Sequence, residues 1–236
     1  MITPILISPN DTSYRFPDVS LALDDPNGLL AIGGDLSPPR LLAAYRHGIF
    51  PWFNPGEPIL WWSPNPRAVL YPDKIKISRS LRKTLRKNIF TLTTDLAFDD
   101  VMRACQAPRI TQQGTWITSE MRIAYGRMHE LGYAHSVECW KDNELAGGLY
   151  GMALGRVFYG ESMFSRVTDG SKVALVHLTD KLKEWGYQLI DCQVQSDHLT
   201  RLGAEDIPRQ QFCALLDQWC EQPAADNAWR AHWTAP

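Results

Sequence analysis

The chain has 236 residues, of which 44% are hydrophobic and 21% charged, so it can bury one large core or two unequal ones. Its formal net charge of −2 excludes a protein that is basic throughout, and any nucleic-acid surface must therefore be local. No apolar run approaches the ~18 residues of a membrane span, and residues 1–4 lack the basic start of a signal peptide, so we expect a cytoplasmic protein. The five cysteines and six histidines show no metal-ligand spacing, which predicts neither a metal nor a disulfide framework.

The first 65 residues differ in pattern from the remainder. A short strand is expected over residues 29–32, and Ser37 followed by proline predicts a helix that ends at Gly48. Three tryptophans and two phenylalanines then lie among prolines in residues 49–66. Because proline disfavours regular structure, we expect rings on rigid loops, which suit the stacking of a nucleobase at ~1–3 kcal/mol per base. A small irregular core is the alternative, and the proline-rich turn predicts two domains, residues 1–65 and 66–236.

A basic helix is predicted to begin at Ser78, after a strand over residues 68–71. The helix contains no acidic residue that could pair with its cations. These cations are Arg79, Arg82, Lys83, Arg86 and Lys87. Such a helix can bind phosphates through charge alone, and a merely solvated face is the alternative. A strand over residues 90–94 and helices over 97–106 and 119–131 should follow.

The later part of the chain predicts an antiparallel meander over residues 135–160, a helix over 171–185, a strand over 187–194 and a helix over 208–220. This order is that of the GNAT acyltransferase fold. We therefore expect an α+β protein, in which a small N-terminal α/β domain precedes a GNAT-like domain whose mixed, mainly antiparallel sheet is flanked by helices.

An acetyltransferase that uses acetyl-CoA is one function open to this fold. It would need a glycine-rich turn before the helix, where backbone N–H groups cradle the pyrophosphate. Residues 160–170 carry a glycine only at each end and acidic residues within, so the sequence disfavours acetyl-CoA.

The strand over residues 187–194 begins apolar and then turns polar. Since side chains alternate along a strand, Asp191 and Gln193 should project from one face, about 7 Å apart, while Ile190 and Cys192 project from the other. A buried carboxylate is costly unless it has a partner or a chemical role. An aspartate that caps a neighbouring turn is the alternative.

Six segments together resemble the leucyl/phenylalanyl-tRNA–protein transferase family, from about residue 20 to about residue 215. They are NGLLAIGGDL (27–36), GIFPWF (48–53), WWSP (61–64), GTWIT (114–118), GESMFS (160–165) and LIDCQ (189–193). The resemblance implies transfer of Leu or Phe, with Met as a third donor to test, from aminoacyl-tRNA to the α-amine of proteins that begin with Arg or Lys. It thereby implies an N-degron that marks those proteins for degradation.

The donor ester is already activated, so the reaction needs no cofactor, neither ATP, CoA nor metal. We expect the carboxylate of Asp191 to polarise the side-chain amide of Gln193, whose oxygen receives the incoming α-amine, with Asp191 as the final proton acceptor. In the competing version both residues only position the substrates, because alignment alone can supply ~7–11 kcal/mol.

The resemblance also implies the other binding residues. Glu161, placed just after a predicted strand, would attract the cationic acceptor end. Trp52 and Trp116, with Tyr45 and Tyr125 nearby, would hold the terminal adenosine, and the basic helix would bind the acceptor stem. The apolar pocket for the transferred side chain would be lined by Leu149, Met163, Leu175, Leu178 and Ile190.

By the same resemblance, Leu149 and Leu178 stand where the family usually has Met and Phe. The second exchange changes the volume of the side chain, so the pocket can be reshaped and the preference between Leu and Phe altered. A non-catalytic RNA-binding module is a further alternative, and it would require neither an acid–amide pair on one strand nor an acid at Glu161.

Overall fold

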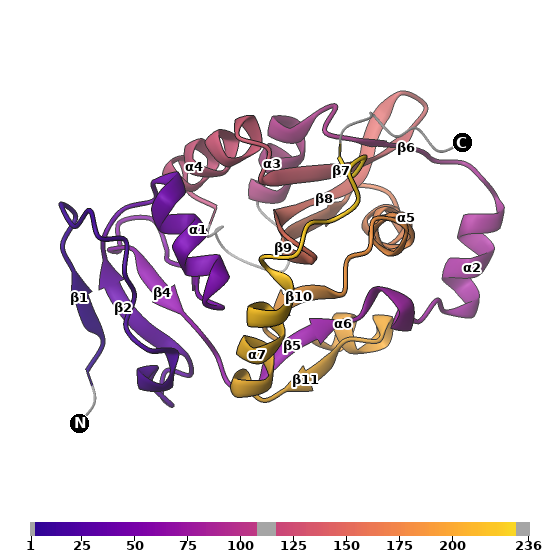
Figure 1. The fold of residues 1–236 in the computed structure, drawn as a ribbon. Coiled ribbons are helices and arrows are strands. Elements are labelled where there is room, and N and C mark those ends of the chain that lie inside the picture. The colour runs from indigo at the N-terminus through magenta and orange to yellow at the C-terminus, as the bar shows by residue number, and fades with distance from the viewer. Residues whose placement is uncertain (1–2, 108–116, 230–236) are drawn as a thin grey trace.

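A computed structural model describes residues 3–107 and 117–229 of the chain. Two sheets organise these residues, one of four strands in the N-terminal region and one of seven strands formed by later segments (Figure 1). None of the helices in these ranges is long and apolar enough to cross a membrane.

The small sheet has the strand order β1-β2-β4-β3 and lies beside α1. Its elements are β1 (Ile5–Ile7), β2 (Leu29–Gly33), α1 (Pro38–Arg46), β3 (Phe50–Pro51) and β4 (Leu60–Trp62). The strand and helix expected here are confirmed, but the aromatic segments are not entirely loops. Pro51 is tolerated because β3 is an edge strand, and β4 contains no proline.

The large sheet has the order β11-β5-β10-β9-β8-β7-β6. Its strands are β5 (Arg67–Leu70), β6 (Thr91–Thr94), β7 (Ala134–Lys141), β8 (Glu144–Leu154), β9 (Val157–Ser165), β10 (Leu189–Gln193) and β11 (Glu205–Ile207). The antiparallel meander β7-β8-β9 is confirmed, and β10 pairs in parallel with β9 after a helical crossover. The third strand of the meander continues five residues beyond the expected end at residue 160, so Glu161 lies within β9.

Helices cover both faces of the large sheet (Figure 1). They are α2 (Arg79–Arg86), α3 (Phe98–Gln106), α4 (Ser119–Glu130), α5 (Gly170–Glu184), α6 (Asp197–Leu202) and α7 (Arg209–Trp219), with short 3-10 turns at Val19–Leu21 and Pro72–Lys74. The helices α2 and α5 pack on one face of the sheet and enclose one core. The helices α1, α3, α4 and α7 pack on the other face and enclose a second core. The expected α+β fold class is confirmed, whereas α6 and β11 were missed because they are too short to show a period.

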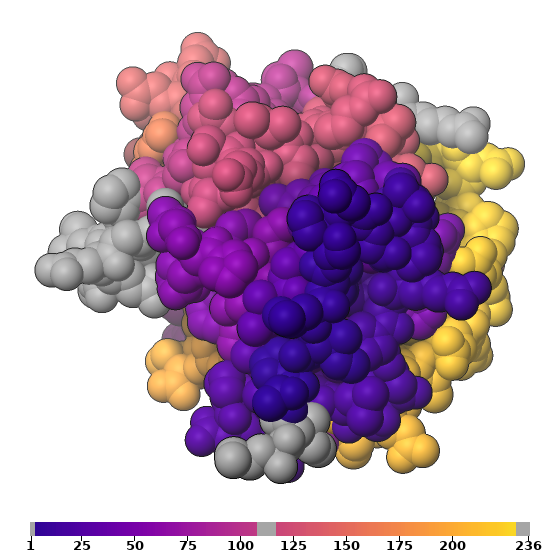
Figure 2. All heavy atoms as spheres, turned by 90° about the vertical axis from the view of Figure 1, so that its left-hand side faces the viewer, coloured from indigo at the N-terminus to yellow at the C-terminus, as the bar shows by residue number. Residues whose placement is uncertain are grey.

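The N-terminal region packs directly on the second of these cores. Tyr45 of α1 and Trp61 of β4 are fully buried in the same cluster as Tyr159 of β9 and Phe212 of α7. Figure 2 shows the N-terminal segment lying over this face of the molecule, against later parts of the chain. The contact brings residues of α1 next to the strands β9 and β10, while the division into domains at residues 65 and 66 stays a prediction.

Candidate active site

A cavity of about 430 Å³ lies between α5, α6 and the strands β8, β9 and β10. Its apolar wall includes all five side chains expected to form the aminoacyl pocket, namely Leu149, Met163, Leu175, Leu178 and Ile190. Glu161 and Gln193 belong to the same lining. The structure therefore gathers the expected pocket residues, the expected acceptor-binding acid and one of the two expected catalytic residues around a single space.

Strand pairing explains why Glu161 and Gln193 are neighbours. In the parallel pair β9·β10, Asp191 is opposite Tyr159, so the chain reaches Glu161 and Gln193 two residues further along each strand. The side-chain Nε2 of Gln193 donates a hydrogen bond to Oε1 of Glu161 at 3.3 Å. The amide and this carboxylate are therefore in direct contact at the cavity.

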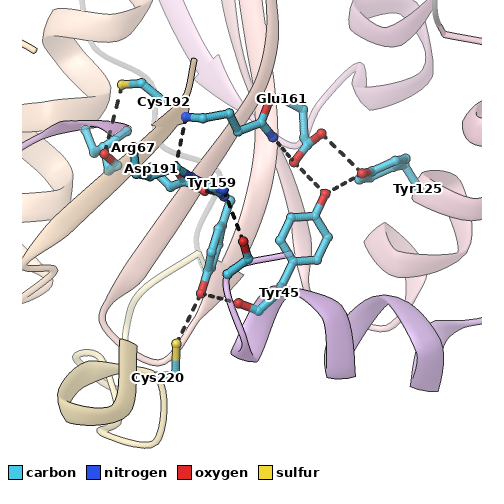
Figure 3. Close-up of polar contacts among 11 residues, drawn as sticks. Tyr45, Arg67, Tyr125, Tyr159, Glu161, Asp191, Cys192 and Cys220 are labelled. Carbon is cyan, nitrogen blue, oxygen red and sulfur yellow. Dashed lines mark hydrogen bonds and ion pairs between the residues drawn. The ribbon is translucent and has the colours of Figure 1, made fainter. Parts of the chain in front are cut away.

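The carboxylate of Glu161 is buried among neutral hydrogen-bond donors (Figure 3). The hydroxyl of Tyr45 from α1 donates to Oε1 at 2.6 Å, and that of Tyr125 from α4 donates to Oε2 at 3.1 Å. The two tyrosine hydroxyls also contact each other. Burial raises the pKa of Glu161 to about 7, with a smaller contribution from the negative charge of Asp191, and the bonds from the tyrosines and Gln193 oppose this rise.

Tyr45 and Tyr125 were expected near the adenosine, as candidates for stacking. Both rings are fully buried, so neither presents a face on which a base could stack. That expectation is wrong, because their hydroxyls are needed to satisfy a carboxylate that lies beneath the N-terminal region.

The second carboxylate, that of Asp191, is fully buried against Arg67 of β5. Nε and Nη2 of Arg67 donate to Oδ1 and Oδ2 of Asp191 at 2.8 and 2.7 Å, a two-point contact that matches the two groups in shape. Nη1 donates to the carbonyl of Gly48 at 3.0 Å, and the guanidinium contacts the rings of Phe50 and Phe212. Asp191 is not among the described residues that line the cavity.

A β-bulge separates Asp191 from Gln193 and changes their expected relation. Gln193 has a φ of 63°, so the backbone no longer alternates as in a regular strand. The Asp191 carboxylate accepts the main-chain N–H of Gln193 at 2.9 Å, while the side-chain amide bonds to Glu161. The expected contact of Asp191 with the side-chain amide is therefore wrong, because an uninterrupted strand was assumed.

Sequence reasoning missed Arg67. It precedes a strand that was expected at residue 68, and it lies 124 positions before its partner. No local pattern connects the two, since the contact depends on the antiparallel pairing of β5 with β10, in which Val69 is opposite Asp191. The only available signal was the cost of burying a lone carboxylate, which implied that a partner had to exist.

The aromatic segments divide into core and surface. Trp61, Phe50 and Phe53 are buried, as the alternative of a small core expected, whereas Trp52 is 48% exposed. The indole N–H of Trp62 donates to the carbonyl of Trp52 at 2.7 Å, which fixes the backbone there. Trp116, the other stacking candidate, lies outside the described residues.

The basic helix forms as expected, with Ser78 accepting the N–H of Leu81 at its start and Leu81 buried beneath it. All five of its cationic residues are exposed, and none forms an ion pair with any residue in the described ranges. Four of them line a surface hollow of about 500 Å³, namely Arg79, Arg82, Lys83 and Arg86. In the same ranges no cluster of three His, Cys, Asp or Glu residues could hold a metal.

The meander, crossover helix and parallel strand beside a cavity with an acid and an amide form an α+β fold whose site suits acyl transfer. Residues 34–65 match a family model described as the leucyl/phenylalanyl-tRNA protein transferase N-terminal domain, and residues 69–217 match the one described as leucyl/phenylalanyl-tRNA protein transferase. The chain therefore belongs to the leucyl/phenylalanyl-tRNA–protein transferase family, whose members are aminoacyltransferases.

Relatives of the same description cover nearly the whole chain. One from Nitrosomonas europaea is 60% identical over 221 residues, which is 94% of each chain, and one from Cellvibrio japonicus is 58% identical over 94% of this chain and 93% of its own. Among solved structures, a GCN5-related N-acetyltransferase from Kribbella flavida is 12% identical with a TM-score of 0.38, over 72% of this chain and 60% of its own. A structure of L-PGS from Bacillus licheniformis is 12% identical with a TM-score of 0.39, over 71% of this chain and 54% of its own. Scores this low carry no functional meaning.

Proposed function

We propose that this enzyme transfers Leu or Phe, with Met as a third donor, from aminoacyl-tRNA to the α-amine of proteins that begin with Arg or Lys. The product has a new peptide bond and carries an N-degron that directs the protein to degradation. The observation that carries this proposal is the single cavity in which five apolar side chains meet Glu161 and Gln193.

The apolar wall would hold the side chain of the transferred amino acid. A volume of about 430 Å³ is at the lower end of small-molecule sites and suits one amino-acid side chain together with the reacting groups. Leu178 is almost completely buried at this wall, and leucine leaves more room there than phenylalanine would. We therefore expect Leu178→Phe to reduce transfer of Phe more than transfer of Leu.

The polar wall would receive the acceptor. Glu161 supplies the negative charge that favours a cationic N-terminal end, and its hydrogen bond to Gln193 keeps the amide beside the reacting atoms. Asp191 would act through Gln193, because its carboxylate holds the main-chain N–H of that residue and is itself held by Arg67. Of the two versions of the mechanism, this arrangement favours the one in which Asp191 positions the amide.

The tRNA would contact two surfaces. The exposed ring of Trp52 would stack on the terminal adenine, and the same role is proposed for Trp116. The exposed cations of α2 would bind the phosphates of the acceptor stem. Figure 1 shows α2 on the side of the molecule opposite the small sheet, so a ligand that reaches both would have to be extended.

The transfer assay tests the proposal directly. The enzyme is mixed with tRNA charged with labelled leucine and with peptides that begin with Arg, Lys or Ala. We expect label in the Arg and Lys peptides and none in the Ala peptide. Label from acetyl-CoA in place of tRNA would support an acetyltransferase, and tRNA binding without transfer to any peptide would support a binding module, so either result contradicts the proposal.

Charge reversal tests the role of α2. The variant Lys83→Glu/Arg86→Glu should weaken binding of every tRNA alike and should reduce the slope of log Kd against log salt by about one unit for each lost phosphate contact. Lys183→Glu, an exposed change on α5, is the matched control and should leave both quantities unchanged. Equal effects of the two variants would remove α2 from the tRNA surface.

A further inference from the structure

Two buried carboxylates contact Gln193, and only one of them has a cationic partner among the described residues. Asp191 is paired with Arg67, whereas Glu161 forms no ion pair with any described residue and accepts hydrogen bonds from two phenols and an amide. The two groups therefore differ in the charge of their partners.

Asp191 is fully engaged by its cationic partner. Both of its oxygens accept hydrogen bonds from Arg67, which is only 1% exposed. The buried guanidinium also contacts two phenylalanine rings, so Asp191 is the counter-charge that it requires. In addition, Asp191 does not line the cavity, so a proton from the substrate has no direct route to it.

Glu161, in contrast, has access to the cavity and no cationic partner among the described residues. It lines the cavity, and one of its oxygens is bonded to the amide of Gln193, which lines the same space. The titratable groups that face it are Tyr45 from α1, Tyr125 from α4, Tyr150 from β8 and Asp191 from β10. None of these is a cation, so nothing among them prevents Glu161 from becoming neutral.

From this geometry we infer that Glu161 is the group that takes the proton from the attacking α-amine, while Asp191 and Arg67 position Gln193. The inference rests on the proposed function and deepens it. The raised pKa of Glu161, about 7, supports it, because a general base is most effective when its pKa lies near the working pH. An ordinary α-amine has a pKa of about 7.7–8.0, so the proton can pass in either direction at little cost.

The proposed step balances as follows. The neutral α-amine attacks the carbonyl carbon of the aminoacyl ester, and the new C–N bond forms as one N–H proton passes to the carboxylate of Glu161. The intermediate then collapses, and the C–O bond to the ribose breaks. The departing ribose oxygen takes the proton back from Glu161, which ends as a carboxylate ready for the next transfer.

The test is the single-turnover rate of leucine transfer as a function of pH, with enzyme and charged tRNA preincubated and the acceptor in excess. An Arg peptide with an aminooxy group in place of its α-amine is the probe, because the pKa of this group lies well below that of an amine and the nucleophile stays neutral. With this probe we expect the rate of the wild type to decrease as the pH drops below about 7, because Glu161 becomes protonated there. This decrease is the acidic limb of the pH profile.

The variants assign that acidic limb to one carboxylate. Glu161→Gln should lower the rate by about 10²–10⁴-fold and remove the limb. Asp191→Asn should lower the rate through the position of Gln193 and should retain the limb, moved somewhat to lower pH because the negative charge of Asp191 contributes to the raised pKa of Glu161. Tyr45→Phe should move the limb to higher pH, because the hydrogen bond from Tyr45 lowers the pKa of Glu161. A merely structural role would not produce this shift, and Tyr45→Phe keeps the inference testable should Glu161→Gln fail to fold.

Three results would overturn the inference: an unchanged rate and limb in Glu161→Gln, loss of the limb in Asp191→Asn, or no shift in Tyr45→Phe. Failure of the proposed function is a distinct outcome, since the wild type would then transfer leucine to no peptide at all.

Discussion

The neighbourhoods of Asp191 and Glu161 show how two buried carboxylates on adjacent strands acquire different properties. Asp191 lies against a guanidinium that is fixed by a carbonyl and by two aromatic rings. Glu161 lies against neutral hydroxyls and an amide that come from α1, α4 and β10. The first carboxylate therefore belongs to a buried ion pair, and the second, whose pKa burial raises to about 7, can gain and lose a proton.

The partner of a carboxylate, more than its burial, therefore decides its chemical role. Both side chains are 9% exposed or less, so burial disfavours the charged form of each. Only for Asp191 does a nearby cation compensate. Substitutions that remove one partner at a time should therefore affect the two neighbourhoods in different ways.

The largest effect is expected from removal of the Asp191 partner. Arg67→Met leaves a buried carboxylate without its cation, and this should lower the free energy of unfolding by about 3–5 kcal/mol. Urea denaturation at neutral pH, followed by tryptophan fluorescence, measures the change.

The control for this variant removes both charges. Arg67→Met/Asp191→Leu should recover much of the lost stability, because no buried charge then remains unpaired. Stability of the single variant within about 1 kcal/mol of the wild type would mean that the pair contributes no more than an exposed one.

A smaller effect, with a dependence on pH, is expected at Glu161. Its pKa is raised from 4.5 to about 7 on folding, so the folded protein binds this proton more tightly than the unfolded chain does. The corresponding stability is present below pH 4.5 and is lost as the pH rises through 7. Between pH 5 and pH 8 the loss should be about 2–3 kcal/mol in the wild type and absent in Glu161→Gln.

Denaturation curves of both proteins at pH 5 and pH 8 check this prediction through the difference between them, in which the other titrating groups cancel. The variant should gain relative stability at pH 8. Parallel behaviour of the two proteins over this range would show that the pKa of Glu161 is not raised.

The smallest effect on stability, together with a large one on transfer, is expected at Gln193. Its φ of 63° is a conformation that glycine adopts without strain, so Gln193→Gly should change the free energy of unfolding by no more than about 1 kcal/mol. Transfer should nevertheless fall strongly, because the amide beside Glu161 is lost. Gln193→Asn, which tolerates the same φ and keeps an amide, should retain more activity in the single-turnover assay, and equal rates for the two variants would remove the amide from the reaction.

Much of the architecture could be read from local patterns. The meander, the crossover helix and the strand with Asp191 follow from alternation, helical spacing and glycine stops, because these signals act within a few residues. The five pocket residues followed from the resemblance to the family, since nothing in their spacing distinguishes them from ordinary core residues. Glycine misled at one point, because Gly160 looked like the end of a strand that in fact continues to Ser165.

The sequence by itself determined the order of the elements, the charge of α2 and the presence of an acid, an amide and an apolar set near one another in the chain. Only the tertiary structure decided that Arg67 pairs with Asp191 and that a bulge directs the Gln193 amide to Glu161. It also decided that Tyr45 and Tyr125 donate hydrogen bonds to the Glu161 carboxylate and do not stack on a nucleobase. The physical reason is that partners of buried charges are chosen by strand pairing and helix docking across tens to more than a hundred residues, where no local pattern reaches.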